Sequence, residues 1–385
     1  MGTPVLNGSG LVITRRVTAI VAELTEDYTR RLIMLLLGGS LCMASSLVRA
    51  EDRLFRGDDL LEVTLNAPLA NITRKRDKSM SSDATLRYRT VDGESGDLDV
   101  QVKVRGNNRL RPSVCIFPPL RVLFRRNQLE GTIFENQERL KLVVQCDPFK
   151  TRHEYALFNE YLAYRILNLI TPKSFRVRLA RIDYEYSDRP ARSRTDFAFF
   201  LEDKDRLADR LGVKPLSLEQ TSAVDLDSSH LNKTSLFQLL IGNVDWSATS
   251  VAAGDCCHNY KLFEQQGADI LSIPYDFDLA GLVNAEYAKP DTEMGLKTVR
   301  QRRYRGYCRN NHLLDEHIGL FNEKKSAIMA LVQEFPHLPP KERQNSASYL
   351  EGFYRIINKP QRVKRVILKR CHKSYFVEVA ADREN

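Results

Sequence analysis

Five short apolar runs between residues 59 and 146 constrain the fold more than any other part of the chain. Each run is rich in β-branched residues or alternates apolar with polar positions, and glycine, asparagine or proline separates it from the next. The runs are LLEVTLNA, ATLRYRT, DLDVQVKV, PLRVLF and RLKLVVQC. Alternation with a period of two predicts β-strands with one buried face. We therefore expect a mostly antiparallel sheet over this region.

The pattern changes to helical spacing over residues 152–170, and Pro172 ends this segment. Two further strand-like runs and a series of helices follow. We expect strands at 175–186, 196–202, 259–265 and 268–275, and helices at 203–211, before Gly242, near 312–334 and at 341–357. This order predicts an α+β fold with two lobes, an antiparallel β-rich N-lobe over residues 51–202 and a mainly helical C-lobe over 203–385.

The first fifty residues have the pattern of an export signal. Arg30 and Arg31 precede an uncharged run that extends from Leu32 to Val48, and small-residue spacing at Val48 and Ala50 is typical of a cleavage site. We predict a signal peptide over residues 1–50, cleaved after Ala50, and a periplasmic or secreted protein. The alternative is an uncleaved N-terminal anchor, which would be the one contact with a membrane, because the run is just under the length that spans a bilayer.

Cysteine usage agrees with export. Beyond residue 50 six cysteines remain, at positions 115, 146, 256, 257, 308 and 371. An even number in an exported chain predicts up to three disulfides, with the pairing left open. The alternative is a zinc site at Cys256, Cys257 and His258, although adjacent cysteines are poor ligands for one tetrahedral ion.

The chain is basic, with a formal net charge of +9 at pH 7. The excess lies in residues 73–78, 298–309 and 361–370, which either attract phosphates, acidic proteins or an anionic membrane surface, or are solvated faces. No helix-turn-helix, zinc-finger or aromatic RNA-binding signature accompanies the charge. We therefore expect no nucleic-acid partner.

Three polar residues stand in order at the edges of apolar segments between residues 236 and 282. They are Asp245, Asn259 and Asp276. Transfer of a phosphoryl group needs a carboxylate that orients the attacking hydroxyl and hard oxygen ligands that hold Mg²⁺. Asp245 suits the first role, and Asn259 and Asp276 the second. The alternative is that all three are ordinary turn residues, since Asp and Asn dominate turns.

Two charged residues lie in apolar settings upstream. Lys141 stands in the run LKLVV, and Glu160 has apolar neighbours along one face of the predicted helix 152–170. A buried ammonium or carboxylate needs a partner. A strand lysine paired with a helix glutamate positions the phosphates of ATP in protein kinases. The alternative is a lysine at a sheet edge and a glutamate on a solvated stripe.

Taken in order, these segments resemble the CotH family of atypical kinases, which comprises spore-coat and secreted protein kinases. The resemblance covers most of the chain beyond residue 50. It rests on VKVRGNN, PPLRVLF, RLKLVVQCDP, NEYLAY, FFLEDKD, IGNVDW, CHNYKLF and IPYDFDLAGLVN. It implies a two-lobed protein-kinase-like fold, with ATP and Mg²⁺ or Mn²⁺ as cofactors, and a protein or small hydroxyl compound as the acceptor.

The resemblance also implies roles on the nucleotide side of the site. Lys141 would contact the phosphates and Glu160 would orient it. The segment that ends at Glu202 would form a hinge against the adenine. A glycine-rich G-x-G-x-x-G loop is absent from the sequence. The phosphate cover would therefore come from Arg105 and the residues that follow it.

On the metal side, the resemblance implies that Asp245 is the catalytic carboxylate. Asn259 and Asp276 would bind the metal, with Asp278 as a second candidate two residues on. Asp245 and Asn259 are fourteen positions apart, whereas protein kinases place the equivalent pair five apart. We expect the intervening segment to return Asn259 to the metal.

Three functions remain open from the sequence. The first is an exported kinase that transfers phosphoryl from ATP. The second is transfer of AMP to a protein hydroxyl, as in the selenoprotein-O-like pseudokinases. The third is a catalytically inactive envelope protein that serves as a binding module, because a periplasm offers little ATP.

Overall fold

The computed structural model describes residues 1–2, 52–249 and 256–373. Residues from Asp52 onward form one unit, distinct from Met1–Glu51. The predicted signal peptide and its cleavage site after Ala50 lie outside the described residues, apart from the first two. None of the helices described in residues 52–373 is long and apolar enough to cross a membrane.

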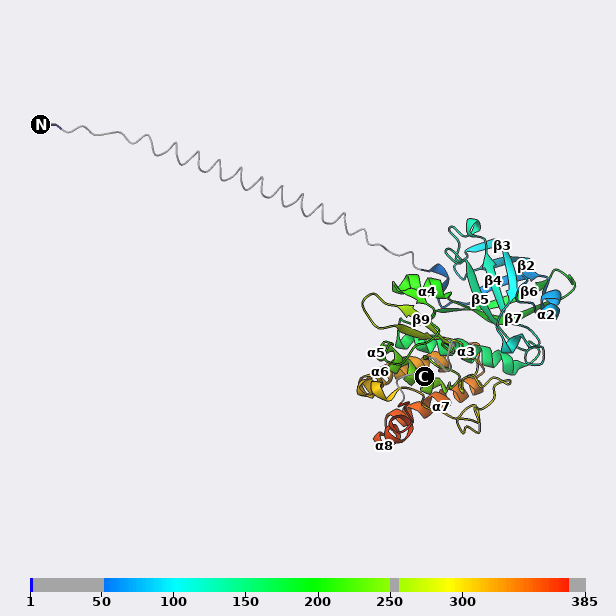
Figure 1. Ribbon diagram of the computed structural model, residues 1–385. Coiled ribbons are helices and arrows are strands. Elements are labelled where there is room, and N and C mark those ends of the chain that lie inside the picture. Colours follow the sequence, from blue (N-terminus) through cyan, green and yellow to red (C-terminus); the bar gives the residue numbers. More distant parts are fainter. Residues whose placement is uncertain (3–51, 250–255, 374–385) are drawn as a thin grey trace, which may run out of the picture. The chain divides into compact units, whose positions relative to one another are not determined.

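Seven strands close into a barrel in the order β1-β2-β3-β4-β5-β7-β6 (Figure 1). They are β1 (Leu61–Ala67), β2 (Ser82–Arg89), β3 (Ser95–Val104), β4 (Leu120–Phe124), β5 (Arg139–Val144), β6 (Val177–Tyr186) and β7 (Ser193–Leu201). Neighbouring strands pair antiparallel except β1 and β6, which are parallel, with Leu61 opposite Ala180. Closure removes the open edges that a sheet of this length would expose.

The barrel has apolar residues on both faces where it meets the helices. On β5, Leu142 belongs to the core inside the barrel, whereas Val143 packs in the helical core outside it. On β7 the same division separates Phe200 from Phe199. Since side chains alternate along a strand, Lys141 shares the outer face with Val143 and is directed toward the helical side.

The helices follow the barrel strands and fill most of the remaining chain. The α-helices are α2 (Leu69–Lys75), α3 (Thr151–Ile170), α4 (Lys204–Leu211), α5 (Ser228–Ile241), α6 (Leu314–Gln333), α7 (Pro340–Ile357) and α8 (Pro360–Val363). Short 3₁₀ segments are η1 (Arg53–Phe55), η2 (Asn108–Leu110), η3 (Arg126–Gln128) and η4 (Cys308–Leu313), and η5 (Lys364–Leu368) is a π-helix.

Helix α3 is the central element, because it contacts β6 and β7 of the barrel on one side and α6 on the other. Most of its residues are buried, which explains the helical period in the sequence. It ends at Thr171, whose extended backbone precedes Pro172. The predicted helix 152–170 is confirmed, as are those that correspond to α4, α5, α6 and α7.

A second, three-stranded sheet has the order β10-β9-β8. Its strands are β8 (Lys214–Leu216), β9 (Tyr260–Glu264) and β10 (Leu271–Pro274). β9 and β10 are antiparallel, which confirms the strand pair predicted over 259–275. β10 ends at Pro274, directly before the predicted metal ligands.

The predicted two-lobed, protein-kinase-like fold with an antiparallel β-rich N-lobe and a mainly helical C-lobe is wrong. The seven strands form a closed barrel with one parallel pair, and the rest of the chain is mixed α/β because it includes β8, β9 and β10. Local alternation predicts individual strands but not closure, since the β1–β6 pairing joins segments more than a hundred residues apart. The boundary predicted between residues 202 and 203 stays a prediction.

Three disulfides join the six described cysteines. Cys115 pairs with Cys146, Cys308 with Cys371 and Cys256 with Cys257. The last pair therefore has no thiolates for the zinc site considered above. Disulfides are typical of proteins in oxidising compartments, so the pairing is compatible with a periplasmic or extracellular protein.

The C115S/C146S double variant is expected to lose about 3–4 kcal/mol of unfolding free energy, because the disulfide closes a segment with a sequence separation of 31. Urea denaturation followed by circular dichroism measures this loss. The C308S/C371S variant opens a longer segment, with a separation of 63, and should lose at least as much. Unchanged urea midpoints in both variants would contradict a stabilising role.

Candidate functional site

Six charged side chains gather between the barrel and α3. The loop after β3 supplies Arg105 and Arg109, β5 supplies Lys141, α3 supplies Glu160, and the segment after β10 supplies the two aspartates. Burial and charges within this set shift the pKa values of Arg105, Lys141, Glu160 and Asp278. We call this set the charged cluster: Arg105, Arg109, Lys141, Glu160, Asp276 and Asp278.

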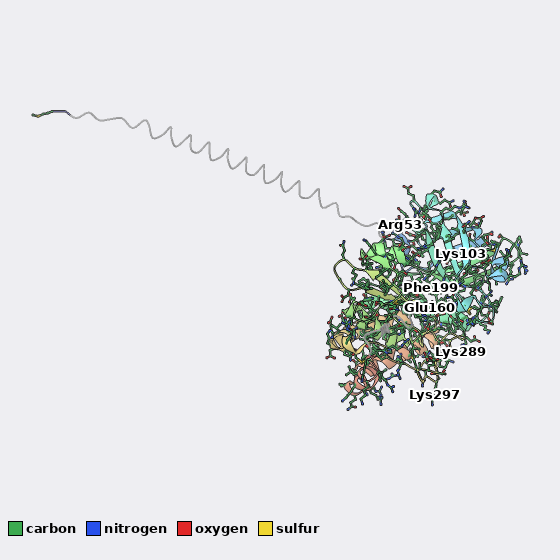
Figure 2. All side chains as sticks on the ribbon, in the orientation of Figure 1. Arg53, Lys103, Glu160, Phe199, Lys289 and Lys297 are labelled. Carbon is green, nitrogen blue, oxygen red and sulfur yellow. A yellow bond between two sulfur atoms is a disulfide. The ribbon has the colours of Figure 1, made fainter. Side chains whose placement is uncertain are left out.

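Glu160 forms its ion pair with Arg109. The Arg109 Nη1 and Glu160 Oε2 atoms are 3.9 Å apart, and both side chains are almost fully buried. Glu160 lies in the interior of the unit (Figure 2). Arg109 also donates to the Val144 carbonyl and lies over the Tyr287 ring, 5.7 Å from its centroid. The ion pair thus joins the loop after β3 and the end of β5 to α3.

The pKa of Glu160 is raised from 4.5 to about 8, mainly by burial and next by the negative charge of Asp278, whereas Arg109 opposes the rise. The sequence predicted Lys141 as the partner of Glu160. Among the described residues the ion pair of Glu160 is with Arg109 instead. Arg109 was missed, and its signal was a second arginine four residues after Arg105 in a loop that is otherwise polar.

Lys141 has an aromatic neighbour rather than an acidic one. Its Nζ lies 4.5 Å from the centroid of the Tyr275 ring, a cation–π distance. Burial and the nearby positive charge of Arg105 lower the pKa of Lys141 from 10.5 to about 7. The Arg105 Nε is buried, and within residues 52–249 and 256–373 it has no hydrogen-bond partner. Two cationic groups therefore point into this region without a direct carboxylate contact there.

Asp276 and Asp278 lie just beyond β10, in a loop rather than on one face of a continued strand. Asp276 has φ of +63°, the left-handed region, and its backbone N–H donates to the Tyr164 hydroxyl at 2.8 Å. Between them Phe277 is buried against Tyr164. These contacts anchor the loop to α3.

Asp278 accepts a hydrogen bond from the Tyr287 hydroxyl at 3.0 Å. Burial, followed by the negative charge of Asp276, raises the pKa of Asp278 from 3.8 to about 7. A cation held beside neighbouring carboxylates favours their ionised forms. The structure therefore brings the two predicted metal ligands within electrostatic reach of each other.

Asp245 has both carboxylate oxygens occupied. Oδ1 is 2.8 Å from the His258 Nε2, and Oδ2 accepts from the Asn259 side-chain amide at 2.9 Å. The same amide donates to the Asp245 carbonyl at 2.7 Å. The fourteen-residue interval thus returns Asn259 to Asp245, whereas its return to a metal stays a prediction; residues 250–255 lie outside the described part.

From the sequence, His258 was considered only as a zinc ligand beside Cys256 and Cys257, and its contact with Asp245 was missed. Its hydrogen bond to Asp245 raises its pKa above the ordinary value, and burial opposes that rise. The negative charge of Asp276 contributes in the same direction. The charge of Asp276, a member of the charged cluster, therefore acts on His258 beside Asp245.

An arginine side chain holds the loop that carries Asp245. Arg305 donates to the carbonyls of Val244 and Trp246, on either side of Asp245, and lies over the Trp246 ring at 5.5 Å. Trp246 packs against Tyr260. Arg305 belongs to the basic segment 298–309, so part of that excess charge has a structural role.

Glu202 follows Leu201, which lies opposite Lys141 in the β5–β7 pairing, but its carboxylate contacts other residues. Its side chain is fully buried, pairs with Arg210 at 2.8 Å and accepts the Arg176 backbone N–H at 2.9 Å. Its own N–H donates to the Arg176 carbonyl. The carboxylate therefore joins β7 to α4 and to the start of β6, and it does not take part in the charged cluster.

Oxygen donors from the loop after β10 and from the residue before β9 suit a hard divalent cation. Asp276 and Asp278 supply carboxylates and Asn259 supplies its side-chain carbonyl oxygen, which no described hydrogen bond uses. Mg²⁺ is bound through one or two carboxylates and retains several waters. Among the described residues no group of three or more His, Cys, Asp or Glu side chains surrounds one point.

Comparison with known proteins adds no family. No protein-family model matches the chain, and no curated protein does.

The E160Q variant is expected to have a flatter dependence of stability on pH. Because the pKa of Glu160 is 4.5 when unfolded and about 8 when folded, the folded state retains a proton that the unfolded state releases. The unfolding free energy of the wild type therefore falls as the pH rises through this window. Urea denaturation at several pH values should show a slope smaller by up to about 1.4 kcal/mol per pH unit in E160Q.

The exposed Glu316 on α6 provides the control, since E316Q removes the same charge outside the cluster. An E160Q profile that coincides with that of the wild type would show that Glu160 is ionised across this pH range.

Proposed function

We propose that the protein transfers a phosphoryl group from ATP to the hydroxyl of a protein or small acceptor, with Mg²⁺ or Mn²⁺ as cofactor. The observation that most supports this proposal is the position of Asp245. Its carboxylate is oriented by His258 and Asn259, is about one third exposed, and lies within electrostatic reach of Asp278. An oriented and accessible carboxylate beside acidic metal donors and unpaired cations is the set that phosphoryl transfer requires.

The proposed step forms a bond between the acceptor oxygen and the γ-phosphorus and breaks the bond from that phosphorus to the β,γ-bridging oxygen, so that ADP leaves. The acceptor proton moves to the Asp245 carboxylate. The two hydrogen bonds that Asp245 accepts hold it in one orientation, which lowers the entropy lost on reaching the transition state. His258 adds positive charge beside it when protonated.

The cationic groups of the cluster would hold the nucleotide phosphates. Arg105 has a buried Nε without a described partner, and Lys141 has no carboxylate in direct contact. An approaching phosphate would raise the pKa of Lys141 from about 7, since an opposite charge favours the ammonium form. Arg109 would act indirectly, by holding Glu160 in place.

Asp276, Asp278 and Asn259 would hold the metal. The bound ion would neutralise charge on the transferring phosphoryl group. It would also favour ionisation of Asp278, whose pKa is raised to about 7 by burial and by Asp276. The tyrosines Tyr164 and Tyr287 would keep the two aspartates in position.

The resemblance to the CotH family supports this proposal only through residue order and chemistry, since the predicted kinase-like fold is wrong. Export to the periplasm or beyond belongs to the same proposal. It is supported by the disulfides, whereas the signal peptide lies outside the described residues.

The D245N and D276N variants are expected to transfer labelled phosphate at least about a hundredfold more slowly than the wild type, because one loses the proton acceptor and the other a metal ligand. Casein and a set of small hydroxyl compounds serve as trial acceptors. D269N, in the exposed turn between β9 and β10, is the isosteric control and should retain full activity. Full activity in D245N or D276N would refute its assigned role, and an added mass of AMP on the acceptor would replace phosphoryl by adenylyl transfer.

A specific observation favours a second candidate, a catalytically inactive binding protein. Lys141 does not pair with Glu160, and the raised pKa values of Glu160 and Asp278 leave fewer ionised carboxylates near pH 7. Such a site holds a metal less readily.

Thermal denaturation with MgATP separates the two candidates. For the phosphotransferase we expect a rise in melting temperature that requires both metal and nucleotide and is lost in D276N, because ligands that bind the folded state stabilise it. No shift at millimolar MgATP or MnATP would favour the binding protein.

A further inference from the structure

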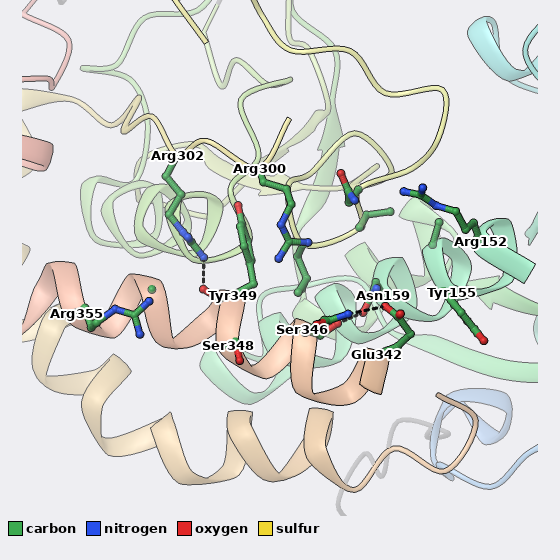
Figure 3. A pocket seen from close by; sticks show the side chains of 16 residues that line it. Arg152, Tyr155, Asn159, Arg300, Arg302, Glu342, Ser346, Ser348, Tyr349 and Arg355 are labelled. Carbon is green, nitrogen blue, oxygen red and sulfur yellow. Dashed lines mark hydrogen bonds between the residues drawn. The ribbon is translucent and has the colours of Figure 1, made fainter. Parts of the chain in front are cut away.

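A cavity of about 770 Å³ lies against α3. Arg152, Tyr155 and Asn159 of α3 line it, whereas Glu160, one position further along, belongs to the charged cluster. The opposite walls come from α7 and from the loop before η4 (Figure 3). Its volume is within the range of small-molecule sites.

The lining is strongly basic. The lining contains four guanidinium groups and one carboxylate. Figure 3 shows the arginines on three elements: Arg300 and Arg302 on the loop, Arg355 on α7 and Arg152 on α3. The carboxylate is that of Glu342, which accepts from the Asn345 side chain at 3.3 Å. Four positive charges against one negative charge leave a net excess that attracts anions.

One of these arginines has a structural role. Arg302 donates to the backbone carbonyls of Leu239, Leu240 and Tyr349 and lies 3.7 Å from the centroid of the Tyr349 ring. Burial lowers the pKa of Arg302, and the positive charges of Arg300 and Arg355 lower it further. The charges of Arg300 and Arg355 therefore both act on Arg302.

The other three arginines are available to a ligand. Within the part of the chain that the structure describes, Arg152, Arg300 and Arg355 have no ion pair and no side-chain hydrogen bond to a protein group. Arg300 lies over the Tyr349 ring at 4.4 Å. Arginines brought together without carboxylate partners can offer paired N–H donors to phosphate oxygens, a geometry in which arginine exceeds lysine.

Of the two tyrosines that line the cavity, Tyr155 and Tyr349, the second is not available to a nucleobase. Arg300 and Arg302 both lie over the Tyr349 ring, so its faces are not free for stacking. The remaining lining includes the polar side chains of Asn159, Asn284, Ser346 and Ser348. These groups suit hydroxyl or phosphate oxygens.

We propose that this cavity binds a small soluble molecule that carries two or more phosphate groups, held by Arg152, Arg300 and Arg355. Arg302, which backbone carbonyls hold in place, adds positive charge to the cavity lining. The site is independent of the proposed phosphoryl transfer, because none of its residues belongs to the charged cluster or to the Asp245 group.

Isothermal titration calorimetry with inorganic pyrophosphate tests the proposal on the whole chain. The R300Q/R355Q variant should bind at least about tenfold more weakly than the wild type, since it loses two charged donors. R343Q is the matched control, because Arg343 lies on α7 outside the cavity and its loss removes the same charge. Orthophosphate should bind more weakly than pyrophosphate, because it engages fewer of the arginines.

A further variant, R105Q, separates this cavity from the proposed nucleotide site. Loss of pyrophosphate binding in R300Q/R355Q but not in R105Q supports the proposal, whether or not the protein transfers phosphate. Loss in R105Q alone, equal weakening in R343Q, or no binding by the wild type at 10 mM pyrophosphate, roughly the weakest limit for a specific site, would overturn it. Circular dichroism melting of R300Q/R355Q should match the wild type, which excludes misfolding as the cause.

Discussion

The buried contact between Arg109 and Glu160, whose raised pKa favours the protonated acid near pH 7, is the one on which the candidate site depends. It joins the loop after β3 to α3, and through the Val144 carbonyl it also holds the end of β5. A buried carboxylate is stable only when it is paired or protonated, so removal of either partner leaves an unfavourable group in the interior. The barrel and the helical part thereby have one fixed arrangement at the place where the functional side chains meet.

Other polar contacts extend this arrangement to the acidic side of the site. Tyr164, one turn further along α3 than Glu160, receives the Asp276 N–H. Tyr287 donates to Asp278 and lies beneath Arg109. The helix that buries Glu160 therefore also sets the position of the loop after β10. Charges from three segments influence one another because the surrounding packing excludes water.

Much of the candidate site was predictable from residue type and order. Asp245, Asn259, Asp276 and Asp278 stand at the ends of apolar runs, and folding does place the first two in contact. The partner of Glu160 was predicted wrongly, because apolar surroundings show that a charge needs a partner but not which cation reaches it. Arg109 and the contact of His258 with Asp245 were missed for the same reason, since these roles come from neighbours far away in the sequence.

The local patterns by themselves determined the barrel strands, β9, β10 and the main helices, whereas α2 and β8 were not predicted. The period of two marked the barrel strands, the helical period marked α3, and Gly242 ends α5 with φ of +66°. Only the tertiary structure decided that the strands close into a barrel and that Glu202 pairs with Arg210 rather than facing a ligand. Periodicity shows which face of an element is buried. Closure and ion pairing depend on which segment, distant in the sequence, packs against that face.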